Sequence, residues 1–185
     1  MRTTDSVNAR ILRSRLGPQL ARSVLVAFGL LVSSPVQAGT ATANLTVTAS
    51  VAANCSISTN TLAFGSYDPV TTHAASPLDG TGSIVVTCTN GASTTVTLGQ
   101  GSNAAGGSTD TVPLRRMKAG TSNYLSYTLY QDAGRNTAWG NTSGTGVNHT
   151  GTGTSTSITV YGRVAASQNV PTGSYTDTVV ATITF

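Results

Sequence analysis

Hydrophobic and polar residues alternate strictly along residues 44–51, which is the pattern of a β-strand with one apolar face. The apolar positions are Leu45, Val47, Ala49 and Val51, and threonine or serine stands between them. Such a strand pairs either with its own sheet or with an exposed sheet edge of another molecule. The pattern alone leaves both arrangements open.

Further runs rich in β-branched and aromatic residues follow, separated by Gly, Asn, Ser and Pro. They occupy residues 55–57, 62–64, 83–88, 94–98, 124–130, 157–161 and 175–185. Two segments without apolar periodicity, residues 99–110 and 140–156, are expected to be surface loops. No segment shows the period of an amphipathic helix, so we predict one all-β domain, a sandwich of seven or eight strands.

Residues 1–38 have the three parts of a secretory signal peptide. Arginines come first, residues 23–32 form an apolar run, and Val36, Gln37 and Ala38 offer a cleavage site. A transmembrane helix needs about 20 apolar residues, roughly twice the length of this run. We therefore expect export through the inner membrane to the periplasm and then to the cell surface, and not an integral membrane protein.

Removal of residues 1–38 changes the charge of the chain. The full sequence has ten basic and six acidic residues and a net charge of +4, and five basic and one acidic residue precede residue 39. The mature chain then has five of each and no net charge, which gives no support for nucleic acid as a partner. Its one basic cluster, Arg115, Arg116 and Lys118, is expected to be a solvated loop or strand edge. Neither interleaved aromatic residues nor a second basic patch points to a polyanion site.

The mature chain keeps both cysteines, Cys55 and Cys88. An even number of cysteines in an exported chain indicates a disulfide instead of a metal or redox site. Closing a loop of about 33 residues stabilises a fold by roughly 3–4 kcal/mol on the chain-entropy model.

Catalytic and metal-binding groups are scarce after residue 38. The histidines are His73 and His149, there is no glutamate, and no spacing brings a nucleophile, a base and an orienting acid together. Both histidines are expected to be exposed loop residues and not metal ligands. We predict no enzymatic activity, no cofactor and no metal. Trp139 is expected to pack at the end of the sandwich and not to form a sugar-stacking platform.

Several short motifs along the mature chain occur together in a known family. The most specific are residues 127–132 (Tyr-Thr-Leu-Tyr-Gln-Asp), Arg135, residues 139–140 (Trp-Gly), residues 173–177 (Gly-Ser-Tyr-Thr-Asp) and the alternating residues 179–185. In these motifs and their order the chain resembles the spore coat protein U domain family, which includes the pilin subunits of archaic chaperone–usher pili.

This resemblance implies an immunoglobulin-like β-sandwich that lacks its last strand, with an N-terminal donor strand at residues 39–53 and the sandwich at residues 54–185. The donor side chains would be Leu45, Val47, Ala49 and Val51. The terminal strand beside the acceptor groove, which the chaperone would also bind, would present Val179, Ala181, Ile183 and Phe185.

The resemblance also implies partners and a role. The partners would be a periplasmic pilus chaperone, an outer-membrane usher and other pilin subunits, including copies of this chain in a head-to-tail polymer. The role would be that of a structural subunit of surface fibres for adhesion and biofilm formation. The alternative is a secreted, non-polymeric coat component or a carbohydrate-binding β-sandwich module.

Overall fold

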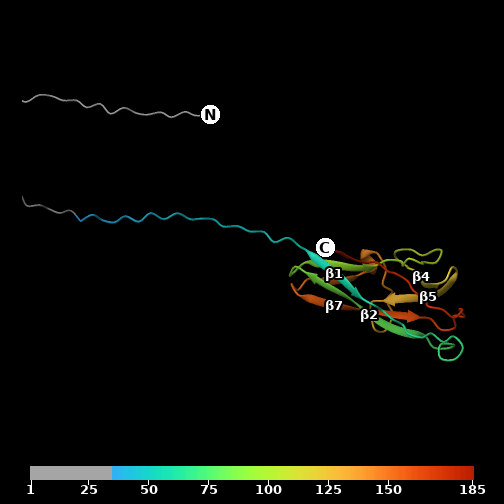
Figure 1. The fold of residues 1–185 in the computed structure, drawn as a ribbon. Coiled ribbons are helices and arrows are strands. Elements are labelled where there is room, and N and C mark those ends of the chain that lie inside the picture. Colours follow the sequence, from blue (N-terminus) through green and yellow to red (C-terminus); the bar gives the residue numbers. More distant parts are fainter. Residues whose placement is uncertain (1–34) are drawn as a thin grey trace, which may run out of the picture. The chain divides into compact units, whose positions relative to one another are not determined.

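The computed structural model describes residues 35–185, so the predicted signal peptide lies outside the described residues except for residues 35–38. The chain divides into two units, residues 1–47 and 48–185, and both β-sheets belong to the second (Figure 1). Residues 35–47 of the first unit form no helix or strand, and all are exposed. Residues 35–185 contain no helix with the length and hydrophobicity of a membrane span.

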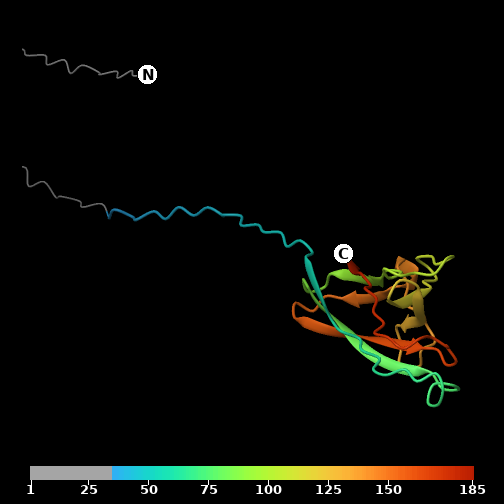
Figure 2. The ribbon, with the colours of Figure 1, turned by 45° about the vertical axis from the view of Figure 1, so that its right-hand side comes forward.

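The larger sheet has five antiparallel strands. Their order across the sheet is β1 (Cys55–Asn60), β2 (Leu78–Cys88), β7 (Ser155–Val164), β5 (Asn123–Tyr130) and β4 (Arg115–Ala119). The long strands β2 and β7 run side by side over most of their length (Figure 2), with Ile84 opposite Ile158 in the register. Inward and outward positions alternate along each strand, as the period-two pattern of the sequence predicts.

The smaller sheet has three antiparallel strands, in the order β6 (Val147–Thr150), β3 (Ser93–Leu98) and β8 (Ala181–Thr184). One short 3-10 turn, η1 (Ser143–Thr145), precedes β6. Buried side chains of both sheets form a common core: Ile84, Val86, Val96, Leu98, Leu125, Tyr127, Leu129, Trp139, Val160 and Val164. Each buried aliphatic side chain of this size stabilises the fold by about 1.5–3 kcal/mol.

The disulfide prediction is confirmed, since Cys55 and Cys88 are bonded to each other. They are also directly opposite residues at one end of the β1–β2 ladder. The bond therefore joins the first residue of β1 to the last residue of β2.

The prediction of seven or eight strands is confirmed in number, but several boundaries differ. Residues 44–51 form no strand within this chain, because an alternating segment becomes a strand only where a partner edge is available. Residues 62–64 are extended but pair with no strand, and of residues 175–185 only β8 forms a ladder of more than one pair. The predicted loop at residues 99–110 is confirmed.

One strand lies where none was expected, and another lies where the sequence left a loop and a strand edge open. Strand β6 falls inside the predicted loop at residues 140–156 and pairs through its main chain with β3. The sequence did not indicate it, because Val-Asn-His-Thr has a single apolar residue. Strand β4 is formed by the basic cluster and pairs with β5 at the edge of the larger sheet. Edge strands often carry charged side chains, and a search for alternating apolar residues does not detect such strands.

Three side chains are more buried than their sequence context suggested. His73 is buried, because its ring stacks on Tyr67 at 5.0 Å and its Nδ1 accepts a hydrogen bond from the main-chain N–H of Asp68 at 2.9 Å. His149 belongs to β6 and is half-buried, so the expectation of an exposed loop residue is wrong for both histidines. Arg115 has 1% of its surface exposed, so this part of the cluster is not solvated.

Trp139 packs in the core, as expected. Its side chain is fully buried, and its indole Nε1–H donates a hydrogen bond to the carbonyl oxygen of Val96 at 2.9 Å. A fully buried ring has no face left for a sugar, so this residue forms no stacking platform.

Candidate functional site: an apolar groove with unpaired edges

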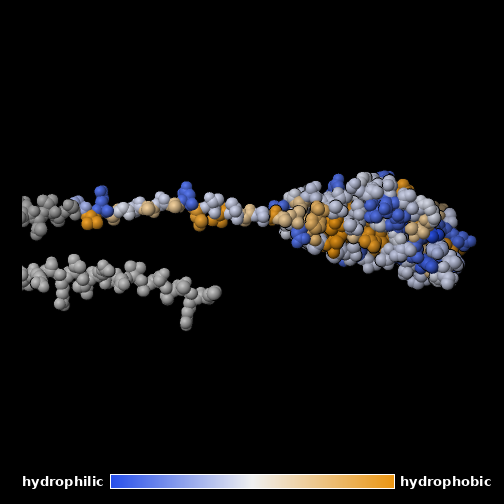
Figure 3. All heavy atoms as spheres, turned by 90° about the horizontal axis from the view of Figure 1, so that it is seen from above, coloured by the Kyte–Doolittle hydropathy of each residue, from blue (hydrophilic) through white to orange (hydrophobic). Residues whose placement is uncertain are grey.

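A groove of about 1420 Å³ opens along the sandwich. Apolar residues of the core form its floor, among them Leu98, Met117, Leu125, Val160 and Val164. Figure 3 shows hydrophobic residues, in orange, gathered on one face of the sandwich. A contiguous exposed apolar surface of this kind is typical of a binding site for a protein, a ligand or a membrane.

One edge of the groove is the extended segment of residues 61–67, between β1 and β2. Leu62, Phe64 and Tyr67 are half-buried, whereas the residues between them are exposed. Within the described residues, no main-chain group of this segment is hydrogen bonded to another main-chain group. The segment is therefore held by its side chains and leaves its backbone free for pairing.

Glycines beneath this segment let it lie directly on the larger sheet. A Cβ atom placed on Gly82 would lie 2.9 Å from the Cβ of Leu62, and one on Gly162 would lie 2.8 Å from the Cζ of Phe64. Phe64 in turn meets the ring of Tyr127 edge to face, with 5.9 Å between ring centroids. Glycine within a strand often marks a place where another segment approaches closely. These glycines were therefore a sequence signal for this edge of the groove, although the pattern of hydrophobic residues does not include them.

The opposite edge is the segment of residues 175–180, which leads into β8. The main-chain groups of its even-numbered residues form hydrogen bonds on one side of the segment. Thr176 exchanges two main-chain hydrogen bonds with Lys118. The carbonyl oxygens of Thr178 and Val180 accept from the main-chain N–H groups of Ser102 and Gly99. In an extended chain the main-chain groups of odd-numbered residues point the other way. Among residues 35–185, the N–H and C=O groups of Asp177 and Val179 form no hydrogen bond with main-chain groups.

A polar network supports this second edge. The Asp177 carboxylate accepts hydrogen bonds from the Tyr127 hydroxyl at 2.7 Å and from the Asn103 side-chain amide at 3.0 Å. Burial, together with the hydrogen bond to Asp177, raises the pKa of Tyr127 well above its usual value. Tyr127 therefore stays a neutral donor and holds the terminal segment to β5.

Arg115 ties the two sheets together beside the groove. From the end of β4 its guanidinium donates to the carbonyl oxygens of Leu98 at 2.7 Å, Gly99 at 2.9 Å and Trp139 at 2.8 Å. Burial lowers the pKa of Arg115 to about 10, so it stays charged at neutral pH. Charge-assisted bonds of this kind are about twice as strong as neutral ones.

The structure places the predicted donor residues in the open. Leu45, Val47 and Val51 have 88%, 83% and 85% of their surface exposed, and Ala49 is also exposed. Large apolar side chains that alternate along an exposed segment are available to pack against another surface.

The predicted terminal-strand residues divide into two pairs. Val179 and Ala181 line the groove. Ile183 is half-buried but lies farther along β8, opposite Val96, and Phe185 is 55% exposed. Neither Ile183 nor Phe185 lines the groove.

Residues 35–185 contain no group of three or more His, Cys, Asp or Glu side chains placed to hold a metal ion.

Comparison with known proteins agrees with this architecture. The chain is 53% identical over 170 residues to Protein U of Myxococcus xanthus, an alignment that covers 88% of this chain and 95% of that protein. In fold it is similar to a chain in the crystal structure of the CsuC–CsuE chaperone–tip adhesion subunit pre-assembly complex of the archaic chaperone–usher Csu pili of Acinetobacter baumannii. The TM-score is 0.51 at 20% sequence identity, over 73% of this chain and 40% of that chain.

The structural likeness confirms the predicted all-β, immunoglobulin-like sandwich. This chain spans less than half the length of that solved chain, so the likeness concerns the fold. The family model of the Spore Coat Protein U domain matches residues 41–182, which is most of the chain. Together with the relative at 53% identity, this match shows that the chain belongs to the Spore Coat Protein U domain family.

Proposed function

We propose that this chain is a structural subunit of an archaic chaperone–usher pilus and that it polymerises by donor-strand complementation. The apolar segment of residues 39–53 of one copy enters the groove of the next copy. Because each copy both donates and accepts, the contact is head-to-tail and propagates as a fibre. Surface attachment and biofilm formation are the roles we assign to that fibre.

The observation that carries this proposal is the pair of unpaired edges. Residues 61–67 and 175–180 both flank the groove, and both leave main-chain groups without main-chain partners in the described part of the chain. A single added strand can bond to both edges while its alternate side chains cover the apolar floor. Residues 44–51 supply such a strand, with its apolar face exposed.

The energetics favour the larger apolar residues as anchors. Burying Leu45, Val47 or Val51 would contribute about 1.5–3 kcal/mol each, and Ala49 much less. Ordering the segment costs about 1–2 kcal/mol per residue, so side-chain burial alone does not hold it. Main-chain pairing on two sides must add to it, which is why the unpaired edges matter.

An open apolar groove also calls for protection before assembly, since unpaired strand edges aggregate. A periplasmic chaperone that fills the groove and an outer-membrane usher that exchanges it for the next subunit would provide this. The structural relative comes from a chaperone–subunit complex, which supports a chaperone as partner. Export by the signal peptide precedes both steps. The alternative is a secreted coat component, with which the names of the family and of its relative Protein U are compatible.

The test uses a matched pair of substitutions on the two faces of residues 44–51. Val47→Asp places a charge on the apolar face, and Thr48→Asp places the same charge one residue later on the polar face. We expect Val47→Asp to abolish SDS-resistant ladders and fibres in electron micrographs, and Thr48→Asp to preserve both.

Polymer from Val47→Asp at the level of the unaltered chain would refute donor-strand complementation. Equal loss in both variants would show that the two faces are not distinguished and would contradict the proposed insertion. Fibres on vegetative cells would support a pilus, whereas polymer confined to a coat layer would support the alternative.

A further inference from the structure

The outward face of the larger sheet carries most of the positive charge after residue 38. Arg116 and Lys118 lie on β4, Arg163 lies on β7, and Arg135 follows β5. The fifth cation, Arg115, points into the core. Sequence alone showed neither a second basic patch nor aromatic residues between the cations, and the fold supplies both.

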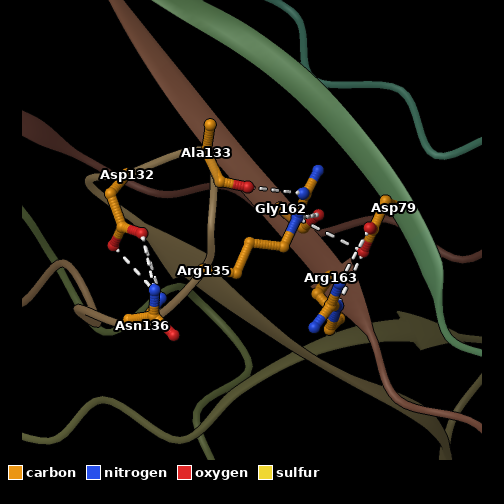
Figure 4. A network of polar contacts seen from close by, with 7 residues as sticks. All are labelled: Asp79, Asp132, Ala133, Arg135, Asn136, Gly162 and Arg163. Atoms are coloured by element: carbon orange, nitrogen blue, oxygen red, sulfur yellow. Dashed lines mark hydrogen bonds and ion pairs between the residues drawn. The ribbon is translucent and has the colours of Figure 1, made fainter.

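Arg135 and Arg163 share one carboxylate, as Figure 4 shows. Arg163 donates to both oxygens of Asp79, from Nε at 2.7 Å and from Nη2 at 2.9 Å, and Arg135 Nε lies 3.3 Å from the same carboxylate. The nearby Asp132 accepts instead from the main-chain N–H groups of Asn136 and Thr137. Asp79 and Asp132 together balance the charges of Arg135 and Arg163, so the positive charge that remains on this face is that of Arg116 and Lys118.

A pocket of about 310 Å³ lies on this face and is lined by Arg116 and Arg163. Tyr130 supplies an aromatic wall, and Ser126 and Thr128 on β5 supply hydroxyl groups. A volume of this size is at the lower end of the range for small-molecule sites. It suits a group the size of a sugar ring.

Both arginines are held in place before any ligand arrives. Arg116 donates from Nε to the carbonyl oxygen of Asn103 at 3.1 Å and from Nη2 to that of Ala104 at 3.0 Å, and its guanidinium stacks 3.9 Å above the ring of Tyr124. Arg163 is held along the same Nε–Nη2 edge by Asp79. Among the described residues, the Nη1 group of neither arginine has a hydrogen-bond acceptor. Such preorganised donors bind a carboxylate at little further entropic cost.

We infer that this pocket binds a carboxylate-bearing sugar of an acidic polysaccharide. The carboxylate accepts from Arg116 and Arg163, the sugar ring packs against Tyr130, and Ser126 and Thr128 offer partners for sugar hydroxyls. A nucleic acid fits less well, because the chain after residue 38 has no net charge and the cations form one pocket and not a stripe along a groove.

The test measures binding of a short oligogalacturonate to the mature chain by isothermal titration calorimetry, with a neutral oligodextran of equal length beside it. Arg116→Gln removes a charge that lines the pocket. Lys118→Gln removes the same charge from the same face of the same strand, outside the pocket. Ser126→Trp fills the pocket from an exposed strand position without changing the charge.

We expect the oligogalacturonate to bind and the oligodextran not to bind. Arg116→Gln should weaken binding by about tenfold or more, the value of one charge-assisted hydrogen bond, and Lys118→Gln by less than about threefold. Ser126→Trp should abolish binding while near-ultraviolet circular dichroism stays unchanged.

Absence of binding by the parent chain would overturn the inference. Equal weakening by Arg116→Gln and Lys118→Gln would also overturn it, since diffuse charge would then explain the affinity. Unchanged binding by a folded Ser126→Trp variant would exclude the pocket, and equal affinity for a DNA oligonucleotide would exclude a sugar-specific site. None of these outcomes bears on polymerisation, which uses the groove.

Discussion

Replacement of Arg115 by methionine tests how the two sheets are held together. Methionine keeps an apolar side chain of similar length but removes the three hydrogen bonds to the carbonyl oxygens of Leu98, Gly99 and Trp139. These acceptors belong to β3, to the residue after it and to the segment before η1, whereas Arg115 belongs to β4. The substitution therefore removes a link between sheets without removing a strand.

The expected magnitude follows from two opposing contributions. Three hydrogen bonds from a charged donor contribute about 1.5–3 kcal/mol each, or roughly 5–9 kcal/mol together. Burying a guanidinium costs several kcal/mol, a cost that methionine does not have. We expect Arg115→Met to lower the free energy of unfolding by about 2–4 kcal/mol. Arg115→Lys should lower it at least as much, because a buried ammonium keeps the desolvation cost and cannot reach all three acceptors.

Trp139 makes the measurement direct, since it is the only tryptophan in the chain, is fully buried and accepts one of the three hydrogen bonds. Urea unfolding of the disulfide-bonded chain, followed by its fluorescence, gives the free energy of each variant. Lys118→Met on the same strand is the control, with an expected change within about 0.5 kcal/mol. An Arg115→Met variant as stable as the parent chain would refute the reasoning, because the hydrogen bonds would then only balance the cost of burial.

Three further outcomes follow from the structure. Replacing both cysteines by serine should lower the free energy of unfolding by roughly 3–4 kcal/mol, measured by urea unfolding, because the disulfide closes a loop between residues 33 apart. Gly162→Ala, whose Cβ would meet an aromatic ring at 2.8 Å, should cost about 1–3 kcal/mol in the same assay, and Gly106→Ala, with open space around it, should cost far less. Hydrogen bonds from a threonine hydroxyl and from main-chain N–H groups lower the pKa of Asp68 to about 2, which an NMR titration of its carboxyl group would measure. A folded-state pKa below the unfolded value of about 3.9 stabilises the fold above pH 4, and this contribution should be lost as pH falls toward 2.

The alternating apolar runs predicted the strands that build the core. They succeeded where both members of a ladder are rich in β-branched or aromatic residues, as in β2, β3, β5 and β7. They failed for β6, whose pairing uses main-chain groups that every sequence possesses, and for β4, whose side chains are mostly charged. A period-two pattern needs several apolar residues at alternate positions, whereas β6 has only Val147 and β4 combines Met117 and Ala119 with a buried arginine, so neither run was recognised.

Burial of polar side chains was beyond the reach of the sequence for a related reason. The acceptors of Arg115 lie 16, 17 and 24 residues away along the chain, and only the packing of the two sheets brings them together. His73 is buried by a local loop, in which Tyr67 stacks on its ring. A buried polar side chain whose hydrogen bonds are formed inside the protein cannot be told from a surface residue by a pattern of hydrophobic positions.

The groove could be predicted only in part. The terminal alternating segment indicated one edge, but the other edge depends on glycines of β2 and β7 that admit Leu62 and Phe64. What defines the site is that two extended segments have main-chain groups without main-chain partners among residues 35–185. A local sequence pattern cannot show that a sheet lacks a strand. The expectation of a missing last strand therefore came from the resemblance to a family.

The position of the disulfide connects the fold to the proposed polymer. A pull on a donated N-terminal segment would first act on the hydrogen bond between the Asn54 carbonyl and the Thr89 N–H, and would then reach Cys55, the first residue of β1, and the β1–β2 ladder. The first pair of this ladder is Cys55 with Cys88, and its covalent bond passes the load to β2. Because β2 lies between β1 and β7, the load is then shared by a strand bonded on both sides. Oxidation of the cysteines before assembly is therefore what would let a fibre of such subunits bear tension.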